Sequence, residues 1–246
     1  MIAADQVLTG RDALLAATGH HPYVRHALRR DQAVRGWRRE GTVGWLLPPG
    51  ESSAGGAVGA PGPALDAFAD LWADGTLRPG QSVNLPRATA AEVAARLPVA
   101  RTGEWDFLWA TDPPARQPGQ ERVVRLTGAD HPALAALVEE AYPGTTSRPG
   151  DPGIVDWYGI RDGERLIACG ADRSRGDIGF LAGLAVAPGD RGRGLGAALT
   201  AGMTRALVAR YDQVALGVYT VNVGAIRLYR RLGFTGTAPR TTVYLA

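Results

Sequence analysis

The sequence predicts an α/β fold for its carboxy-terminal half, and three observations lead to this class. Apolar runs of strand length alternate with segments whose apolar residues recur at helical spacing. Asp162-Gly163 separates two strand-like runs by a two-residue turn, which is typical of an antiparallel hairpin. A glycine-rich turn over 189–196 joins an apolar run to a helical segment. This alternation of strands and helices is typical of α/β proteins.

The elements of this half follow one another from residue 122 to residue 245. Asp130 can cap the first helix, Asn222 can cap the last one, and Gly233 can end it. Residues 143–153, rich in Pro, Gly, Ser and Thr, are expected to form a loop. The predicted strands are 122–126, 157–160, 165–171, 179–186, 214–219 and 241–245, and the predicted helices are 132–142, 195–210 and 222–233.

The first half has weaker patterns. Helices are predicted near 13–17, 64–73 and 88–97, strands near 44–47 and 107–110, and a loop over 50–62. Residues 111–120 contain three prolines and are typical of a linker. We therefore predict two domains, 1–115 and 121–246.

The turn Asp190-Arg191-Gly192-Arg193-Gly194-Leu195-Gly196 suits a pyrophosphate, because glycines allow close backbone approach and a helix start offers unpaired N–H groups. Arg191 and Arg193 would add charge-assisted contacts. A glycine-rich turn with two solvated arginines is the simpler alternative. A Walker A loop is excluded because the sequence contains no lysine. A dinucleotide loop is disfavoured because residues 188–191 separate the strand from the glycines and no acidic residue closes the next strand.

With Arg191-x-x-Gly194-x-Gly196 in place, the sequence resembles the GNAT superfamily of N-acetyltransferases. A second motif, the segment 222–234 with its Leu-Tyr and Gly-Phe pairs, resembles that family's downstream signature. The resemblance covers 121–246 and implies a mixed, mostly antiparallel sheet flanked by helices. The first half is similar to the degenerate GNAT-like domain that precedes the active one in glycine N-acyltransferase-like proteins. It lacks the Arg-x-x-Gly-x-Gly turn, so no second CoA site is expected.

The resemblance implies acetyl-CoA as acyl donor and a set of cofactor-binding residues. It also implies that Tyr229 is the general acid, because a phenol is protonated at neutral pH and can donate a proton to a departing thiolate. The alternative for Tyr229 is a tyrosine that only packs on its own helix. Asn222 can be a helix cap, a cofactor contact or both. The cofactor-binding residues are Leu184, Ala185, Val186, Arg191, Gly192, Arg193, Gly194, Leu195, Gly196, Asn222, Ala225 and Tyr229.

The general base is where the sequence departs from the family. Many members carry a glutamate on the strand before the CoA turn, whereas residues 178–183 contain no carboxylate. The remaining candidates are each expected to be solvated surface charges, because acidic side chains are rarely buried. They are Asp156, Asp172, Asp177, Glu139 and Glu140.

Other residue types give little sign of further chemistry. Cys169 lies in an apolar run and is expected to be an inert core residue. The four histidines are not spaced as metal ligands, so no metal is predicted. A net charge of +3 spread along 246 residues does not indicate nucleic-acid binding. The chain has neither an apolar run of membrane-spanning length nor a signal-peptide pattern, so a cytoplasmic location is expected.

The sequence is therefore interpreted as an enzyme that transfers an acetyl group from acetyl-CoA to a primary amine of a small molecule or peptide, by direct attack in a ternary complex. The alternative is a catalytically inactive CoA-binding regulatory or scaffold protein. The sequence leaves the acceptor, the acyl-chain length and the oligomeric state open.

Overall fold

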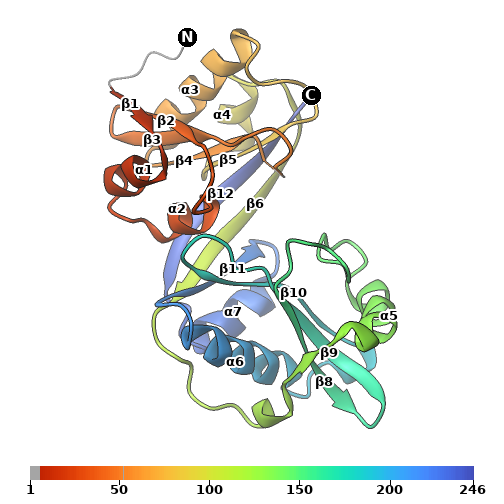
Figure 1. Cartoon of the computed structure of the whole chain (residues 1–246). Helices are drawn as coiled ribbons and strands as arrows, with labels where there is room; N and C mark the ends of the chain where they lie inside the picture. Colours follow the sequence, from red (N-terminus) through yellow and green to blue (C-terminus); the bar gives the residue numbers. More distant parts are fainter. Residues whose placement is uncertain (1–5, 52) are drawn as a thin grey trace. The chain divides into compact units, whose positions relative to one another are not determined.

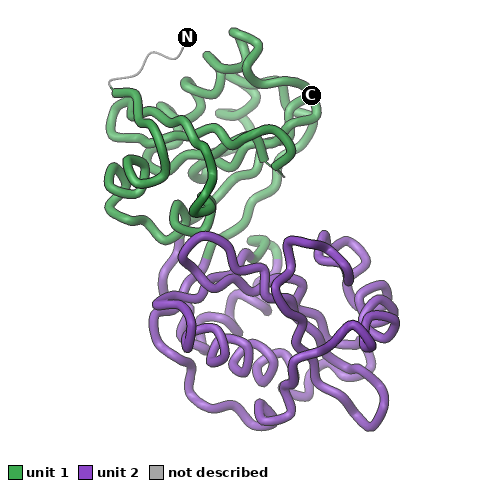
Figure 2. The backbone as a smooth tube through the Cα atoms, viewed as in Figure 1, with its two compact units in different colours: residues 1–107, 218–221, 238–246 green, residues 108–217, 222–237 purple. Residues whose placement is uncertain are grey.

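A computed structural model describes residues 6–51 and 53–246 of the chain, and its contacts divide the chain into two compact units (Figure 2). Unit 1 comprises residues 1–107, 218–221 and 238–246, and unit 2 comprises 108–217 and 222–237. Three strands contribute residues to both units: β6 (Val99–Ala110), β11 (Val214–Tyr219) and β12 (Gly236–Leu245). The predicted division into 1–115 and 121–246 stays a prediction, and the units differ from it because 238–246 pack with the first part of the chain.

Unit 1 is an α/β unit in which helices follow its first, fourth and fifth strands (Figure 1). Its strands lie in the order β1-β2-β3-β4-β5-β12; the first four pair antiparallel, β4 pairs β5 in parallel, and β5 pairs β12 antiparallel. The elements are β1 (Gln6–Thr9), α1 (Arg11–Ala17), α2 (Pro22–Ala27), β2 (Arg35–Arg39), β3 (Thr42–Leu46), β4 (Gly55–Val58), α3 (Pro61–Ala73), β5 (Ser82–Pro86) and α4 (Ala90–Ala94).

The core of unit 1 forms between its sheet and α3. The apolar face of α3 buries Leu65, Phe68 and Leu71, and the ring of Phe68 meets Trp37 edge-on at 5.5 Å. Burying a side chain of this size contributes about 1.5–3 kcal/mol. This packing fixes α3 over β3 and β5 and so fixes where the helix begins.

Unit 2 repeats the alternation of strands and helices. Its strands lie in the order β11-β10-β9-β8-β7, and all neighbours pair antiparallel except β10 with β11. The elements are β7 (Val124–Leu126), α5 (His131–Ala141), β8 (Asp156–Asp162), β9 (Arg165–Asp172), β10 (Gly179–Val186), α6 (Leu195–Val208), β11 and α7 (Val223–Arg231), with single 3-10 turns η1 (Gln120–Arg122), η2 (Gly128–Asp130) and η3 (Pro188–Asp190). This is the predicted mixed α/β architecture.

The sequence patterns of the second half are confirmed with small shifts. The strands 179–186 and 214–219 have the predicted bounds. The expected hairpin between β8 and β9 is present, but its two turn residues are Gly163 and Glu164, because Asp162 is the last residue of β8 and pairs with Arg165. Asp130 was expected to cap α5 and does not. Its carboxylate accepts the N–H of Thr127 at 2.7 Å and pairs with Arg161, so it serves the 3-10 turn before the helix.

One expectation for the first half is wrong. Residues 50–62 were expected to form a loop, but they contain β4 and the start of α3. Gly55 and Gly56 occupy β4 because a Cβ on Gly55 would lie 2.2 Å from the carbonyl oxygen of Trp45 and one on Gly56 2.9 Å from its ring. The glycines therefore mark close strand packing, not a turn. Across residues 6–51 and 53–246, no helix has both the length and the apolar character needed to cross a bilayer.

Candidate active site

β10 leaves its parallel neighbour and then contains a bulge. The register between β10 and β9 shifts between Ala182 and Ala185, with Gly183 in the left-handed region at φ +57°. Pairing with β11 ends at Leu181, although β10 continues to Val186. The edge of 182–186 is therefore not paired with β11 and is available to another extended group. The predicted residues Leu184, Ala185 and Val186 lie in this stretch.

The turn after β10 leads into α6 with its first N–H groups free of helical bonds. Gly192 and Gly194 are left-handed at φ +78° and +79°, and Gly194 is the N-cap of α6. Helical bonding begins with the N–H of Ala198 donating to Gly194 O at 3.0 Å. The N–H groups of Leu195, Gly196 and Ala197 therefore point out of the helix start, where the helix dipole favours an anion.

The two arginines of the turn have protein partners. Arg191 donates through Nη2 to Ala141 O at the end of α5 (3.2 Å), and Arg193 donates to Asp190 Oδ1 at 2.6 Å. The Asp190 side chain is 3% exposed and also pairs with Arg165 at 2.7 Å. The buried carboxylate of Asp190 thus pairs with two half-exposed guanidinium groups, those of Arg165 and Arg193. One negative charge beside two positive charges leaves this cluster net positive.

The last helix lies against the start of α6. Asn222 is confirmed as the N-cap of α7, because its side-chain oxygen accepts the N–H of Ala225 at 3.1 Å. A Cβ on Gly196 would lie 3.5 Å from Leu228 Cδ2, which places α7 next to the free amides. The structure therefore brings the predicted residues on α7 to the same end of unit 2 as the turn.

Tyr229 is 9% exposed and packs against Phe234, with ring centroids 6.0 Å apart. Burial, with a smaller contribution from Tyr142, raises the pKa of Tyr229 to about 12. Its phenol is thus protonated at every pH near neutrality. Since Tyr142 follows Ala141, which accepts from Arg191, the end of α5, the turn and α7 converge on one region.

The candidate carboxylates are mostly engaged in ion pairs. Asp172 was expected to be a solvated surface charge and is instead fully buried, pairing with Arg210 at 2.6 Å and accepting the N–H of Ser174 at 2.9 Å. Burial is possible because these donors replace its hydration. Asp156 pairs with Arg125, and Glu139 with Arg148 at 3.4 Å. Asp172 is thus a structural residue.

We expect Asp172→Asn to lower the free energy of unfolding by about 2–3 kcal/mol, because Arg210 loses its charged partner and a buried network loses an acceptor. Urea unfolding followed by circular dichroism measures the loss. Glu140→Gln, on an exposed position of α5, should change stability by less than about 0.5 kcal/mol. Equal effects of the two substitutions would contradict the structural role.

Cys169 is confirmed as an inert core residue. It is fully buried, and burial raises the pKa of its thiol to about 12. Within 6–51 and 53–246, no three His, Cys, Asp or Glu side chains are grouped so that they could hold a metal ion.

Sequence reasoning missed two features of this region. The burial of Asp190 depends in part on a distant residue, because one of its two arginine partners, Arg165, is on β9. Ser147, 2% exposed, lies against the bulge, and a Cβ on Gly183 would come within 2.9 Å of its Cβ.

Unit 2 also has two shallow hollows on its surface. One is lined by residues that include Arg205 and Tyr211, and the other by residues that include His131 and Trp157. Neither is lined by residues of the turn 189–196.

Comparison with known proteins gives similarities to one region of the chain and to most of its length. A family model described as FR47-like protein matches residues 157–244. The crystal structure of a putative acetyltransferase from the GNAT family of Novosphingobium aromaticivorans covers 81% of this chain and 86% of its own, with 26% identity and a TM-score of 0.56. The chain is thus similar to the FR47-like family over residues 157–244 and to a GNAT-family protein over most of its length.

Two further similarities agree with a GNAT-like fold. A GCN5-related N-acetyltransferase from Kribbella flavida has a TM-score of 0.54 at 20% identity and covers 94% of each chain, which shows a shared fold. A mycothiol acetyltransferase of Thermobispora bispora is 46% identical over 66 residues, or 26% of this chain. The matched segment spans about a fifth of that relative (22%).

Proposed function

We propose that the chain transfers an acetyl group from acetyl-CoA to a primary amine of a small molecule or peptide, by direct attack in a ternary complex. The observation that carries the proposal is the pairing of two features in unit 2: the free amides at the start of α6 and the adjoining edge of β10 that β11 does not cover. GNAT-like relatives support the class of reaction.

The residues of the turn fit the pyrophosphate of coenzyme A. The N–H groups of Leu195, Gly196 and Ala197 are donors at the positive end of a helix dipole, and Gly192 and Gly194 allow close approach of the backbone. Arg191 and Arg193 supply positive charge from positions fixed by Ala141 and Asp190. Coenzyme A supplies the activated acyl group when it is bound.

The unpaired edge of β10 fits the extended arm of the same molecule. Residues 182–184 and Val186 are half-buried, so their backbone can be approached from outside. In the proposed reaction, the N–H of Val186 stabilises the negative charge that develops on the carbonyl oxygen. The N–H of Ala187 donates to Ile167 O of β9, and because successive N–H groups of a strand point to opposite sides, that of Val186 faces away from β9. A backbone donor does not depend on a particular side chain, so an apolar residue can occupy this position.

Tyr229 is assigned as the general acid, and its protonated phenol donates to the departing thiolate. No carboxylate lies on residues 178–183 to deprotonate the amine. An amine with a pKa near 10 is about 0.1% neutral at pH 7, which adds about 4 kcal/mol to the barrier. We therefore propose an acceptor amine of low pKa, or proton transfer to water.

The test is release of CoA thiol from acetyl-CoA over a panel of amines of graded pKa, with thermal-shift or calorimetric binding of CoA measured in parallel. Release that rises as amine pKa falls supports the proposal. The missing strand carboxylate favours one alternative, a CoA-binding regulatory or scaffold protein without turnover. That alternative predicts CoA binding but no thiol release with any amine. We place either activity in the cytoplasm, without nucleic-acid or membrane partners.

A further inference from the structure

Unit 1 contains the same strand–helix–strand arrangement as the candidate site. Its strands β1 to β4 pair antiparallel and β4 pairs β5 in parallel across α3, as β7 to β10 pair antiparallel and β10 pairs β11 in parallel across α6. The start of α3 and the end of the β4–β5 pairing therefore correspond to the turn and the open edge in unit 2.

The gap between β4 and β5 is occupied by the side chain of Arg240. The last β4–β5 pair joins Gly56 to Asn84. At the next position Arg240 Nη2 donates to Ala57 O of β4 at 2.8 Å and to Asn84 O of β5 at 2.7 Å. The guanidinium thus takes the carbonyl oxygens that an extended ligand would need.

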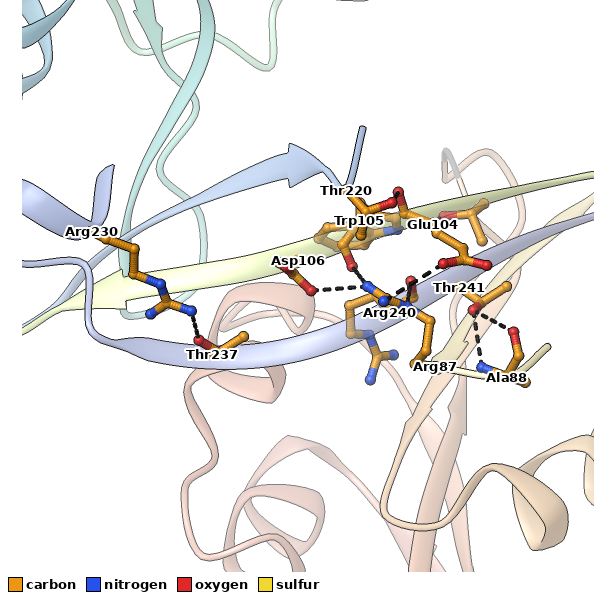
Figure 3. A network of polar contacts seen from close by, with 11 residues as sticks. Arg87, Ala88, Glu104, Trp105, Asp106, Thr220, Arg230, Thr237, Arg240 and Thr241 are labelled. Carbon is orange, nitrogen blue, oxygen red and sulfur yellow. Dashed lines mark hydrogen bonds and ion pairs between the residues drawn. The ribbon is translucent and has the colours of Figure 1, made fainter. Parts of the chain in front are cut away.

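Arg240 is held there from several directions. It is 2% exposed, and its guanidinium carbon lies 3.9 Å from the centroid of the Tyr23 ring. Its own carbonyl oxygen accepts from Arg87 Nε at 3.1 Å, and Arg87 also binds Asp106 at 2.9 Å (Figure 3). The next residue, Thr241, exchanges hydrogen bonds with the backbone of Ala88 (Figure 3). The position of the Arg240 side chain is therefore fixed by the hydrogen bonds that hold its own backbone and that of Thr241.

The start of α3 lacks the donors that α6 offers. Pro61 and Pro63 occupy the first and third helical positions and have no N–H, so Gly62 keeps the only free one of the three. The N–H of Ala60, before the helix, donates to Thr42 Oγ1 at 3.0 Å. The corresponding positions of α6 are Leu195, Gly196 and Ala197, all with N–H groups.

We propose that the chain binds one coenzyme A, in unit 2, and that the corresponding place in unit 1 is closed by its own Arg240 and by the prolines of α3. The inference rests on the proposed function. It assigns unit 1 a role other than cofactor binding, because both requirements of such a site, an open strand edge and free helix amides, are removed there by different residues.

The chain offers a matched pair of substitutions to test this. Gly196 and Gly62 are each the second residue of their helix, neither has positive φ, and an added Cβ would meet Leu228 Cδ2 at 3.5 Å in the first case and nothing within 4 Å in the second. A glutamate suits either helix start, so Gly196→Glu and Gly62→Glu should both fold. Only Gly196→Glu places a negative charge against the proposed pyrophosphate.

Calorimetric titration with coenzyme A should give one molecule per wild-type chain and per Gly62→Glu chain, and at least 100-fold weaker binding to Gly196→Glu. Gly196→Gln, without the charge, should recover part of the affinity, which separates repulsion from misfolding. Two results would overturn the inference and leave the proposed function standing. One is the binding of two molecules per wild-type chain. The other is one molecule that Gly196→Glu still binds and that is lost when Gly62→Glu is added to it. A wild-type chain that binds none would overturn the proposed function and the inference with it.

Discussion

Replacing Tyr229 by phenylalanine is expected to lower kcat by about 100-fold and to leave the affinity for acetyl-CoA nearly unchanged. The hydroxyl is the only group removed, and the ring keeps its packing against Phe234. Because the raised pKa keeps the phenol protonated, the wild-type rate should not fall near pH 10, where an ordinary tyrosine ionises. Steady-state kinetics with thiol detection across pH measures both effects.

Tyr211→Phe is the matched control, since this tyrosine also lies in unit 2 and its ring is near Arg210 at 5.6 Å, at the far end of α6 from the turn. It should leave kcat within twofold of wild type. An unchanged kcat in Tyr229→Phe would show that the phenol only packs, and the proton for the thiolate would have to come from another donor.

Arg240→Met is expected to lower the free energy of unfolding by about 2–4 kcal/mol. Methionine fills part of the volume but leaves Ala57 O and Asn84 O buried without this donor, at about 1–3 kcal/mol for each group, and it loses the contact with the Tyr23 ring. The substitution also removes a buried positive charge, and this offsets part of the loss. Burial disfavours the charged guanidinium, as the lowered pKa of Arg240 shows. Equilibrium unfolding in urea measures the difference.

Arg101→Met provides the comparison, because Arg101 also stacks on a tyrosine, Tyr244, at 3.4 Å but is exposed. The loss there should stay below about 1 kcal/mol. If the two variants lost equal stability, stacking would be the whole contribution of Arg240 and its bonds to the two strands would be negligible.

The sequence predicted unit 2 better than unit 1 for identifiable reasons. The strands 179–186 and 214–219 are apolar runs bounded by turn residues, so local periodicity is enough to place them. β4 consists of Gly-Gly-Ala-Val and has no such signal, because its glycines are selected by the Trp45 side chain and backbone. Tertiary packing, not local propensity, determines that strand.

In the candidate site, too, some features could be predicted from local sequence and others depend on distant residues. The glycine turn, the cap at Asn222 and the position of Tyr229 follow from residue types at fixed spacing, and the turn geometry and cap are present in the structure. The burial of Asp172 and Asp190 depends on arginines 38 and 25 positions away, and no local pattern contains that information. The catalytic and cofactor roles themselves stay predictions.

The placement of β12 bears on how the chain is made. The strand that pairs with β5 and supplies Arg240 is synthesised after the whole of β7 to α7, and Arg240 lies 156 positions after Asn84, whose carbonyl oxygen it binds. The strands β1 to β5 therefore cannot complete their sheet until residues 108–237 have emerged from the ribosome. Unit 1, although first in sequence, would be the slower unit to reach its final structure, and chaperone dependence during translation should concentrate there.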